Sequence, residues 1–142
     1  AGKIIGSGLL DSGGGVNHFA ALVVAAFCIS GQYDEQIVRL RASYRTRRDA
    51  LLAGLSAHLP AGCEWTTPAG GFFVWLRLPK GMDADALLPR AEAAGVSYIP
   101  GARFHSGTGG EDALRLAFSL YEPDELVEAA RRLGAIIREA TH

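Results

Sequence analysis

The chain has 142 residues, of which 49% are hydrophobic, so it is long enough to bury one core and predicts one domain with at most an appended segment. Its formal net charge is −1, which excludes the large excess of lysine and arginine that proteins use to bind nucleic acids or membrane surfaces. We therefore expect small molecules or proteins as partners, with no nucleic acid and no membrane.

The N-terminal residues predict a loop followed by an apolar helix. Three consecutive glycines end the segment Leu9–Gly15, and their backbone freedom disfavours a helix there. Asn17 is a suitable N-cap for a helix over His18 to Ser30, and Gly31 is a suitable stop. Because this helix is apolar on nearly every side, it should be buried by more protein than this chain supplies. Its longest apolar run, Phe19–Ile29, is roughly half the length needed to cross a bilayer.

One long amphipathic helix is predicted from Tyr33 to Leu59, before Pro60 and Gly62. Its apolar residues recur at helical spacing, and charged residues occupy the other faces. We interpret the arginines among them as a solvated helix face, partly offset by acidic neighbours, rather than as a site for an acidic partner. These arginines are Arg39, Arg41, Arg45, Arg47 and Arg48.

Three segments have the composition or the alternation of strands. Phe72–Leu78 lies between a Pro-Ala-Gly-Gly turn and Pro79, and it predicts a central strand. Val96–Ile99 predicts a short strand, and Leu114–Leu120 alternates with period two. The glycine-rich segment Gly101–Gly110 lacks the Lys-Ser/Thr ending of a phosphate loop, so we interpret it as a flexible connection.

Two further helices complete the predicted fold. Asp83–Ala94 has helical composition, and its Pro89 fits only if Asp85 is the N-cap, since otherwise the helix kinks there. Pro123 opens a final helix with acidic residues in its first turn. The order of elements predicts an α+β fold, in which a small mixed or mainly antiparallel sheet packs against helices. The final helix should face the sheet with the apolar stripe Leu126, Ala130, Leu133 and Ile137.

The last predicted strand carries the main candidate site residue, Arg115. Alternation places Leu114, Leu116, Phe118 and Leu120 on the core face and Arg115 on the other face, beside small residues. A guanidinium on a rigid strand can hold a carboxylate through two hydrogen bonds, which a lysine cannot reproduce. From the pattern alone, a solvated or salt-bridged arginine is the commoner interpretation.

Three motifs of the chain occur in an order and spacing that resemble the small domain of the class I/II aminotransferases, which are fold-type I enzymes dependent on pyridoxal phosphate. The motifs are Pro-Ala-Gly-Gly-Phe-Phe-Val-Trp-Leu at 68–76, Gly-Val-Ser-Tyr-Ile-Pro-Gly-Ala-Arg-Phe at 95–104 and Leu-Arg-Leu-Ala-Phe-Ser at 114–119. The resemblance covers essentially the whole chain. Within the family, the chain most resembles the 2-aminoadipate-like and MocR-associated branch.

The resemblance implies roles for three residues. In the family, the arginine that matches Arg115 binds the α-carboxylate of the amino-acid substrate, and the residue that matches Phe104 lies beside the substrate pocket. The stretch around Asn17 resembles one that approaches the cofactor phosphate of the neighbouring subunit. Packing alone for Phe104, and N-capping alone for Asn17, are the open alternatives. The resemblance also implies that residues 1–32 are a remnant of the large cofactor-binding domain and that residues 33–142 form the small domain.

Aminotransferase chemistry needs a lysine that holds pyridoxal phosphate as a Schiff base. The chain has two lysines, Lys3 and Lys80, and neither lies in the family's Schiff-base motif. We therefore expect a fragment of a longer enzyme, which binds no cofactor and is inactive by itself. The parent enzyme is expected to transfer an amino group between an amino acid and a 2-oxo acid.

The remaining residues bear on partners, metals and location. Cys28 and Cys63 lack the spacing of metal ligands or of a disulfide framework, which indicates a reducing cytoplasm. The scattered histidines predict no metal site and no catalytic triad. Apolar surface over Phe19–Ile29 predicts self-association or a homodimer. The alternatives are another pyridoxal-phosphate reaction, the ligand-sensing domain of a MocR-type transcription regulator, or a stand-alone α+β binding or dimerisation module.

Overall fold

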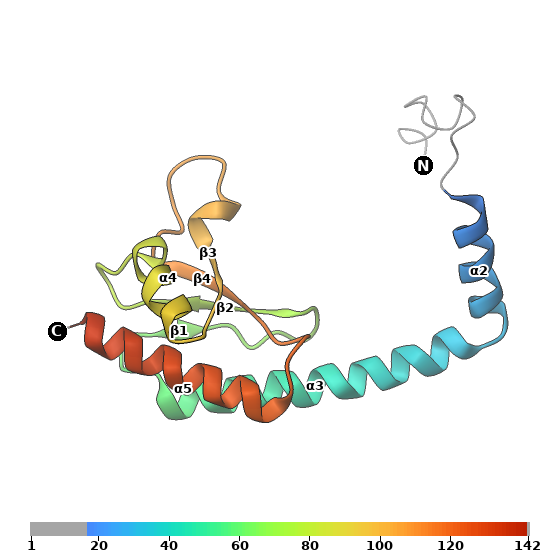
Figure 1. Ribbon diagram of the computed structural model, residues 1–142, viewed down its shortest axis with the longest axis horizontal. Coiled ribbons are helices and arrows are strands. Elements are labelled where there is room, and N and C mark those ends of the chain that lie inside the picture. The colour runs from blue at the N-terminus through green and yellow to red at the C-terminus, as the bar shows by residue number, and fades with distance from the viewer. Residues whose placement is uncertain (1–16, 142) are drawn as a thin grey trace. The chain divides into compact units, whose positions relative to one another are not determined.

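The computed structural model describes residues 17–141 and divides into two compact units, residues 1–41 and 42–142. The boundary between the units falls inside the long helix α3, which runs over Gln32–His58 (Figure 1). The predicted loop at Leu9–Gly15 lies outside the described residues. Among the helices that the structure describes, none combines the length and the apolar character that crossing a membrane requires.

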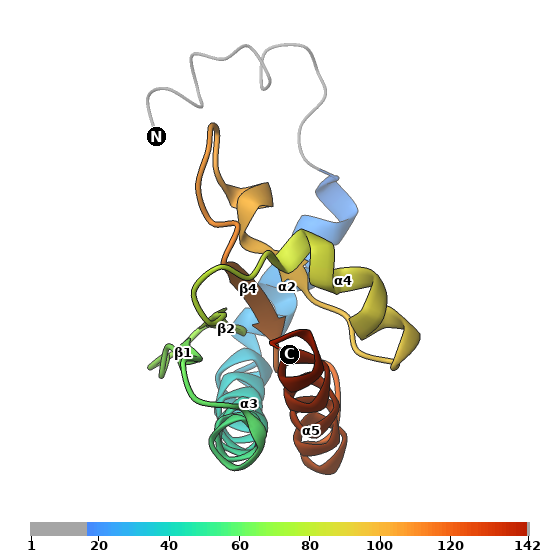
Figure 2. The ribbon, with the colours of Figure 1, turned by 90° about the vertical axis from the view of Figure 1, so that its left-hand side faces the viewer.

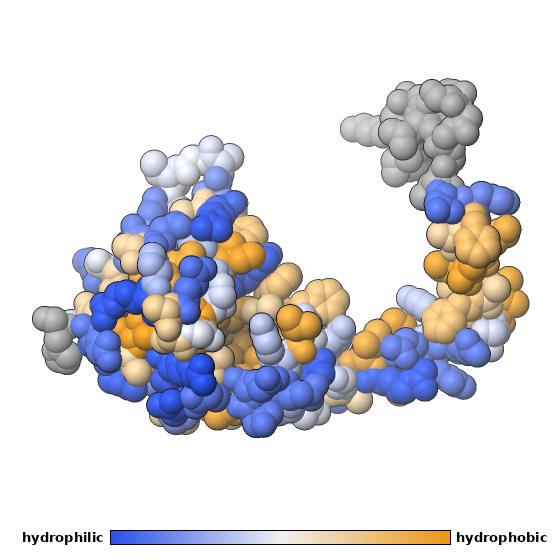
Figure 3. All heavy atoms as spheres, in the orientation of Figure 1, coloured by the Kyte–Doolittle hydropathy of each residue, from blue (hydrophilic) through white to orange (hydrophobic). Residues whose placement is uncertain are grey.

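The first unit contains helix α2, His18–Ile29, and the start of α3. Asn17 caps α2 as predicted, because its side-chain oxygen accepts a hydrogen bond of 3.1 Å from the backbone N–H of Ala20. Gly31 has a positive φ of 80° and separates α2 from α3, which confirms the predicted stop. No residue of α2 is buried within this chain, and Figure 3 shows apolar side chains exposed along it.

The second unit is built on a four-stranded sheet of order β1-β2-β4-β3, in which every pair is antiparallel. The strands are β1 (Glu64–Trp65), β2 (Phe73–Arg77), β3 (Ile99–Pro100) and β4 (Ala113–Ala117). The prediction that the Phe72–Leu78 segment is a central strand is confirmed, since β2 has a neighbour on each side. The α+β class is also confirmed, with a purely antiparallel sheet among the described strands.

Helices cover one face of this sheet. The C-terminal part of α3 and helix α5, Pro123–Ala140, lie side by side beneath it, and helix α4, Ala84–Ala93, packs beside α5 (Figures 1 and 2). The core forms between them from alternate residues of β2 and β4 and from the apolar faces of the three helices. All four residues of the apolar stripe predicted for α5 are buried: Leu126, Ala130, Leu133 and Ile137.

Two glycines allow α3 and α5 to approach closely. A side chain at Gly134 of α5 would clash with the backbone carbonyl of His58, the last residue of α3. A side chain at Gly54 of α3 would lie 3.0 Å from the Ala130 methyl group. The helix pair therefore depends on hydrogen atoms at these two positions, where any other residue would push the helices apart.

Some predicted boundaries were wrong. The N-cap of α4 is Asp83, not Asp85, since the Asp83 carboxylate accepts from the backbone N–H groups of Asp85 and Ala86. Pro89 therefore lies inside α4. Leu120, placed on the core face by strict alternation, is 71% exposed because β4 ends at Ala117 and the chain then turns toward α5.

The segment before β4 also differs from its prediction. Val96 and Tyr98 are buried, but they form no strand pairs, and β3 begins only at Ile99. The first four residues of the predicted glycine-rich loop form the 3-10 helix η1, Gly101–Phe104. The flexible connection is therefore shorter than expected.

Candidate functional site

Arg115 lies at the centre of the sheet face that the helices leave uncovered. Its neighbours directly across the strands are Trp75 on β2 and Ile99 on β3. Opposite residues of an antiparallel pair point to the same face, so these three side chains form one row across the sheet. Trp75 and Ile99 are each 36% exposed, which makes the row accessible from solvent. The predicted orientation of Arg115, away from the core, is confirmed.

Two phenylalanine rings contact the Arg115 guanidinium. Its central carbon lies 3.8 Å from the ring centroid of Phe73 and 4.5 Å from that of Phe104. Phe73 comes from β2, diagonally across the ladder, and its own partner is the small residue Ala117, which leaves room on this face. Both distances are within the range of cation–π attraction.

The position of Phe104 is set by the 3-10 helix η1, of which it is the last residue. Pro100, just before η1, and Gly101, its first residue, are buried. A side chain at Gly101 would lie 2.6 Å from the Gly110 carbonyl oxygen and 2.8 Å from the Ala113 methyl group. Only glycine therefore lets η1 sit against the start of β4. Trp75 supports the Phe104 ring through an edge-to-face contact, with centroids 5.2 Å apart.

The guanidinium has no oxygen partner within residues 17–141. Two arginines of α3 show the contrast: Arg47 bonds Glu122 and the Ser119 carbonyl, and Arg48 bonds Asp49. Arg115 instead makes only ring contacts among the described residues. Because phenyl rings are not hydrogen-bond acceptors of ordinary strength, its N–H donors are left for an external acceptor. A carboxylate matches such a fork through two parallel hydrogen bonds.

The structure brings together some of the predicted site residues and adds others. Phe104 contacts Arg115, whereas Asn17 caps a helix of the other unit. Sequence reasoning missed Phe73 and Trp75. Strand alternation puts both of them on the face away from the core, but only the register that pairs β2 with β4 sets them beside Arg115.

The family resemblance implies pyridoxal phosphate, which a lysine would hold as a Schiff base. Lys80 is exposed in the turn between β2 and α4. Lys3 lies outside the described residues. The described part of the chain holds no group of three or more histidine, cysteine or acidic residues that fits a metal ion. It does offer the Arg115 guanidinium, whose donors match the geometry of a carboxylate.

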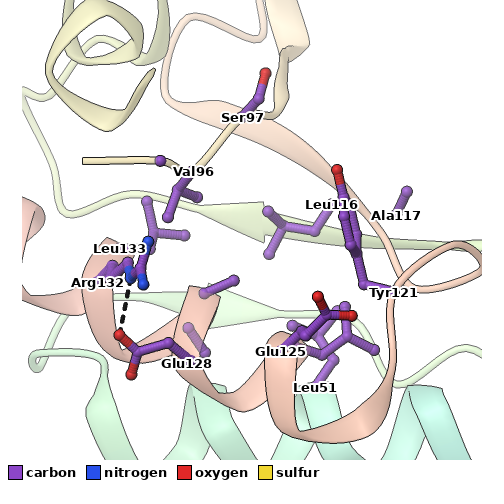
Figure 4. A pocket seen from close by; sticks show the side chains of 14 residues that line it. Leu51, Val96, Ser97, Leu116, Ala117, Tyr121, Glu125, Glu128, Arg132 and Leu133 are labelled. Atoms are coloured by element: carbon purple, nitrogen blue, oxygen red, sulfur yellow. Dashed lines mark hydrogen bonds and ion pairs between the residues drawn. The ribbon is translucent and has the colours of Figure 1, made fainter. Parts of the chain in front are cut away.

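A separate cavity of about 360 Å³ lies on the opposite side of β4, over α5. Figure 4 shows Glu125, Glu128 and Arg132 along its rim and apolar side chains, among them Leu116, within it. The carboxylates are already engaged: Glu125 accepts from the Glu122 backbone, and Glu128 accepts from two arginines, which lower its pKa to about 2. This cavity therefore offers a ligand no free charged group comparable to Arg115.

Comparisons with known proteins identify the family of the chain. The family described as aminotransferase class I and II matches residues 10–133. The chain is 35% identical over 123 residues to aromatic-amino-acid aminotransferase 1 of Thermococcus litoralis, which covers 87% of this chain and 30% of that enzyme. It also resembles the crystal structure of LysN, the α-aminoadipate aminotransferase of Thermus thermophilus, with a TM-score of 0.76 and 34% identity. That match covers 80% of this chain and 29% of LysN.

A more distant relative has another printed description. The chain is 26% identical over 125 residues to YdfD of Bacillus subtilis, an uncharacterized HTH-type transcriptional regulator, and covers 26% of it. The chain thus spans less than a third of the length of each of these proteins. Since the family match extends over most of the sequence, the chain belongs to the class I and II aminotransferases.

Proposed function

We propose that this chain is the substrate-carboxylate-binding part of an aminotransferase that transfers an amino group between an amino acid and a 2-oxo acid. The observation that carries the proposal is the Arg115 guanidinium, fixed by two rings on an open sheet face and without an oxygen partner among residues 17–141. Two parallel N–H···O bonds from this group to the α-carboxylate set the orientation of a bound amino acid.

The cofactor chemistry is assigned to the rest of the parent protein. Relatives of this chain include LysN, whose crystal structure contains N-(5′-phosphopyridoxyl)-L-leucine, and pyridoxal phosphate is therefore the proposed cofactor of the parent. Neither Lys3 nor Lys80 is proposed to hold it, so the isolated chain is inactive. Transaminase assays of the isolated chain with added pyridoxal phosphate test this, and measurable turnover would disprove it.

The same resemblance supports an assignment of the two parts of the chain. Residues 1–32 are proposed to belong to the large domain of the parent and residues 33–142 to its small domain. Asn17, beyond capping α2, is proposed to lie near the cofactor phosphate of a neighbouring subunit in a homodimer. The two cysteines, Cys28 and Cys63, are free, as in a protein of the reducing cytoplasm, which is the proposed location.

The test of the carboxylate role is a pair of substitutions in the complete enzyme. Arg115→Ala should weaken transition-state binding of the amino acid by about 2 to 5 kcal/mol, or roughly 30-fold to several thousand-fold in kcat/KM. Arg115→Lys should recover only part of this loss, because an ammonium cannot make the paired contact. Unchanged kinetics in both variants would end the proposal.

A second candidate is a ligand-sensing domain of a transcription regulator, favoured by the similarity to YdfD. In that case Arg115 would still bind a carboxylate ligand, but the complete protein would bind DNA and need not turn over an amino acid. A DNA-binding assay and a transaminase assay on the complete protein separate the two candidates. DNA binding without transaminase activity would favour the regulator.

A further inference from the structure

The Arg115 side chain is at one end of a set of aromatic contacts that continues to helix α3. Phe73, whose ring lies under the guanidinium, packs edge-to-face against Phe72, with centroids 6.3 Å apart. Phe72 in turn packs edge-to-face against Tyr44 of α3 at 5.3 Å. Phe73 therefore packs against Phe72, which in turn packs against helix α3, although Phe73 is itself 36% exposed.

The second ring is supported in the same manner from the other side of the site. Phe104 lies on η1, which Gly101 fits tightly against β4, and Trp75 contacts the edge of its ring. A long arginine side chain on a strand ordinarily loses rotamer entropy when a ligand fixes it. Two supported rings reduce that cost before the ligand arrives, because they restrict the guanidinium without using its N–H donors.

We propose that Phe73 is a positioning residue for substrate binding: together with Phe104, it holds the Arg115 guanidinium in the orientation that receives the α-carboxylate. This inference rests on the proposed function of Arg115 and adds the residues that preorganise it. It also assigns Phe104 to the arginine rather than to the substrate side chain. Phe73 acts through Arg115 and needs no contact with the reacting atoms.

The first test is spectroscopic and uses the 142-residue chain without cofactor. The Nε–H resonance of Arg115 should carry an upfield ring-current shift in the wild type and in Phe73→Tyr, which keeps the ring. Phe73→Leu should remove most of that shift. The control is Tyr121→Leu, which removes an exposed aromatic residue that makes no ring contact with Arg115 among the described residues. An Arg115 resonance that does not move in Phe73→Leu would overturn the proposal.

The second test uses the complete enzyme and the same variants. Phe73→Leu should lower kcat/KM for the amino acid by about 3- to 30-fold, the range expected for a partly desolvated cation–π contact, mainly through KM. Phe73→Tyr should restore it, and Tyr121→Leu should match the wild type. If Phe73→Leu fails to fold, Phe104→Leu tests the other ring with the same expected loss.

The outcomes separate this inference from the proposed function. A large loss in Arg115→Ala with none in Phe73→Leu would leave the carboxylate role standing and overturn the positioning role. No loss in Arg115→Ala would overturn both. The third outcome is a loss of kcat/KM in each single variant, with a double variant, Arg115→Ala with Phe73→Leu, that loses no more than Arg115→Ala alone. This outcome would support the inference, because Phe73 would then act only through the arginine.

Discussion

The polar side chains of this chain differ in whether their hydrogen-bonding groups already have partners within the fold. The Tyr98 hydroxyl, buried under α4, donates a hydrogen bond of 2.8 Å to the Ala84 carbonyl. Arg47 is likewise committed, to Glu122 and the Ser119 carbonyl, and so ties α3 to the segment before α5. Among the residues that the structure describes, Arg115 contacts only rings, which leaves its donors available. This difference is the reason for proposing that Arg115 binds a ligand, whereas Tyr98 and Arg47 stabilise the fold.

The Tyr98 hydroxyl should make the protein sensitive to alkali. Burial raises the pKa of Tyr98 well above its ordinary value of 10.0, and Asp85 and Asp83 add to the effect. Because the unfolded chain releases this proton at lower pH than the native chain, the stabilisation is complete below about pH 10 and declines as the pH rises beyond it. Urea unfolding at increasing pH should show this decline.

Tyr98→Phe provides the control. It should flatten the alkaline decline while costing about 0.5 to 1.5 kcal/mol at neutral pH, because the Ala84 carbonyl loses its donor. A decline of the same steepness in Tyr98→Phe would assign the alkaline sensitivity to other groups.

At the scale of elements, the sequence predicts the helices better than the strands. Helix α5 begins at Pro123 as predicted, because proline at the first turn and acidic residues beside it are local signals. Strand β1 has only two residues and no alternation to detect, and it exists because Glu64 and Trp65 pair with β2. The late start of β3 has a similar cause, since Val96 and Tyr98 are buried by packing rather than by strand pairing.

The features of the site also differ in whether they depend on local or on non-local signals in the sequence. The orientation of Arg115 follows from the period of one strand and was predictable. Its contact with Phe73 depends on the register between β2 and β4, which lie about forty residues apart in sequence, and on the placement of η1 by Gly101. Such non-local geometry leaves no signal in either segment alone.

The packing of α3 against α5 gives a test at the element scale. Gly134→Ala should destabilise the 142-residue chain by about 1 to 3 kcal/mol, even though alanine favours helix, because its methyl group would meet the His58 carbonyl. Gly107→Ala, in an exposed loop with open space around it, is the control and should be nearly neutral. Thermal unfolding measures both, and equal melting temperatures would refute the close approach.

At the scale of the whole molecule, the two compact units differ in how they are stabilised. The second unit buries a core of its own from three helices and four strands. In the first unit α2 has no buried residue, and Phe19, Leu22 and Ile29 are exposed. An apolar helix in contact with water favours association with other protein surface, and we propose that in the parent this surface belongs to the remainder of the enzyme or to its second subunit.

The isolated chain should therefore self-associate through Phe19–Ile29. Light scattering should give an apparent mass that rises with concentration, and Leu22→Gln with Val23→Gln should lower it by reducing the apolar area. Leu120→Gln, an exposed apolar position of the second unit, is the matched control and should leave the mass unchanged. A monomer at every concentration tested would contradict this expectation.

Binding of the α-carboxylate by Arg115 can be measured by comparing an amino acid with its α-amide as substrates of the complete enzyme. The kcat/KM values of wild type and Arg115→Ala for both compounds form a double cycle. If Arg115 binds the carboxylate, the wild type should strongly prefer the carboxylate, and Arg115→Ala should remove most of this preference, by about 2 kcal/mol or more. An undiminished preference in Arg115→Ala would show that another group binds the carboxylate.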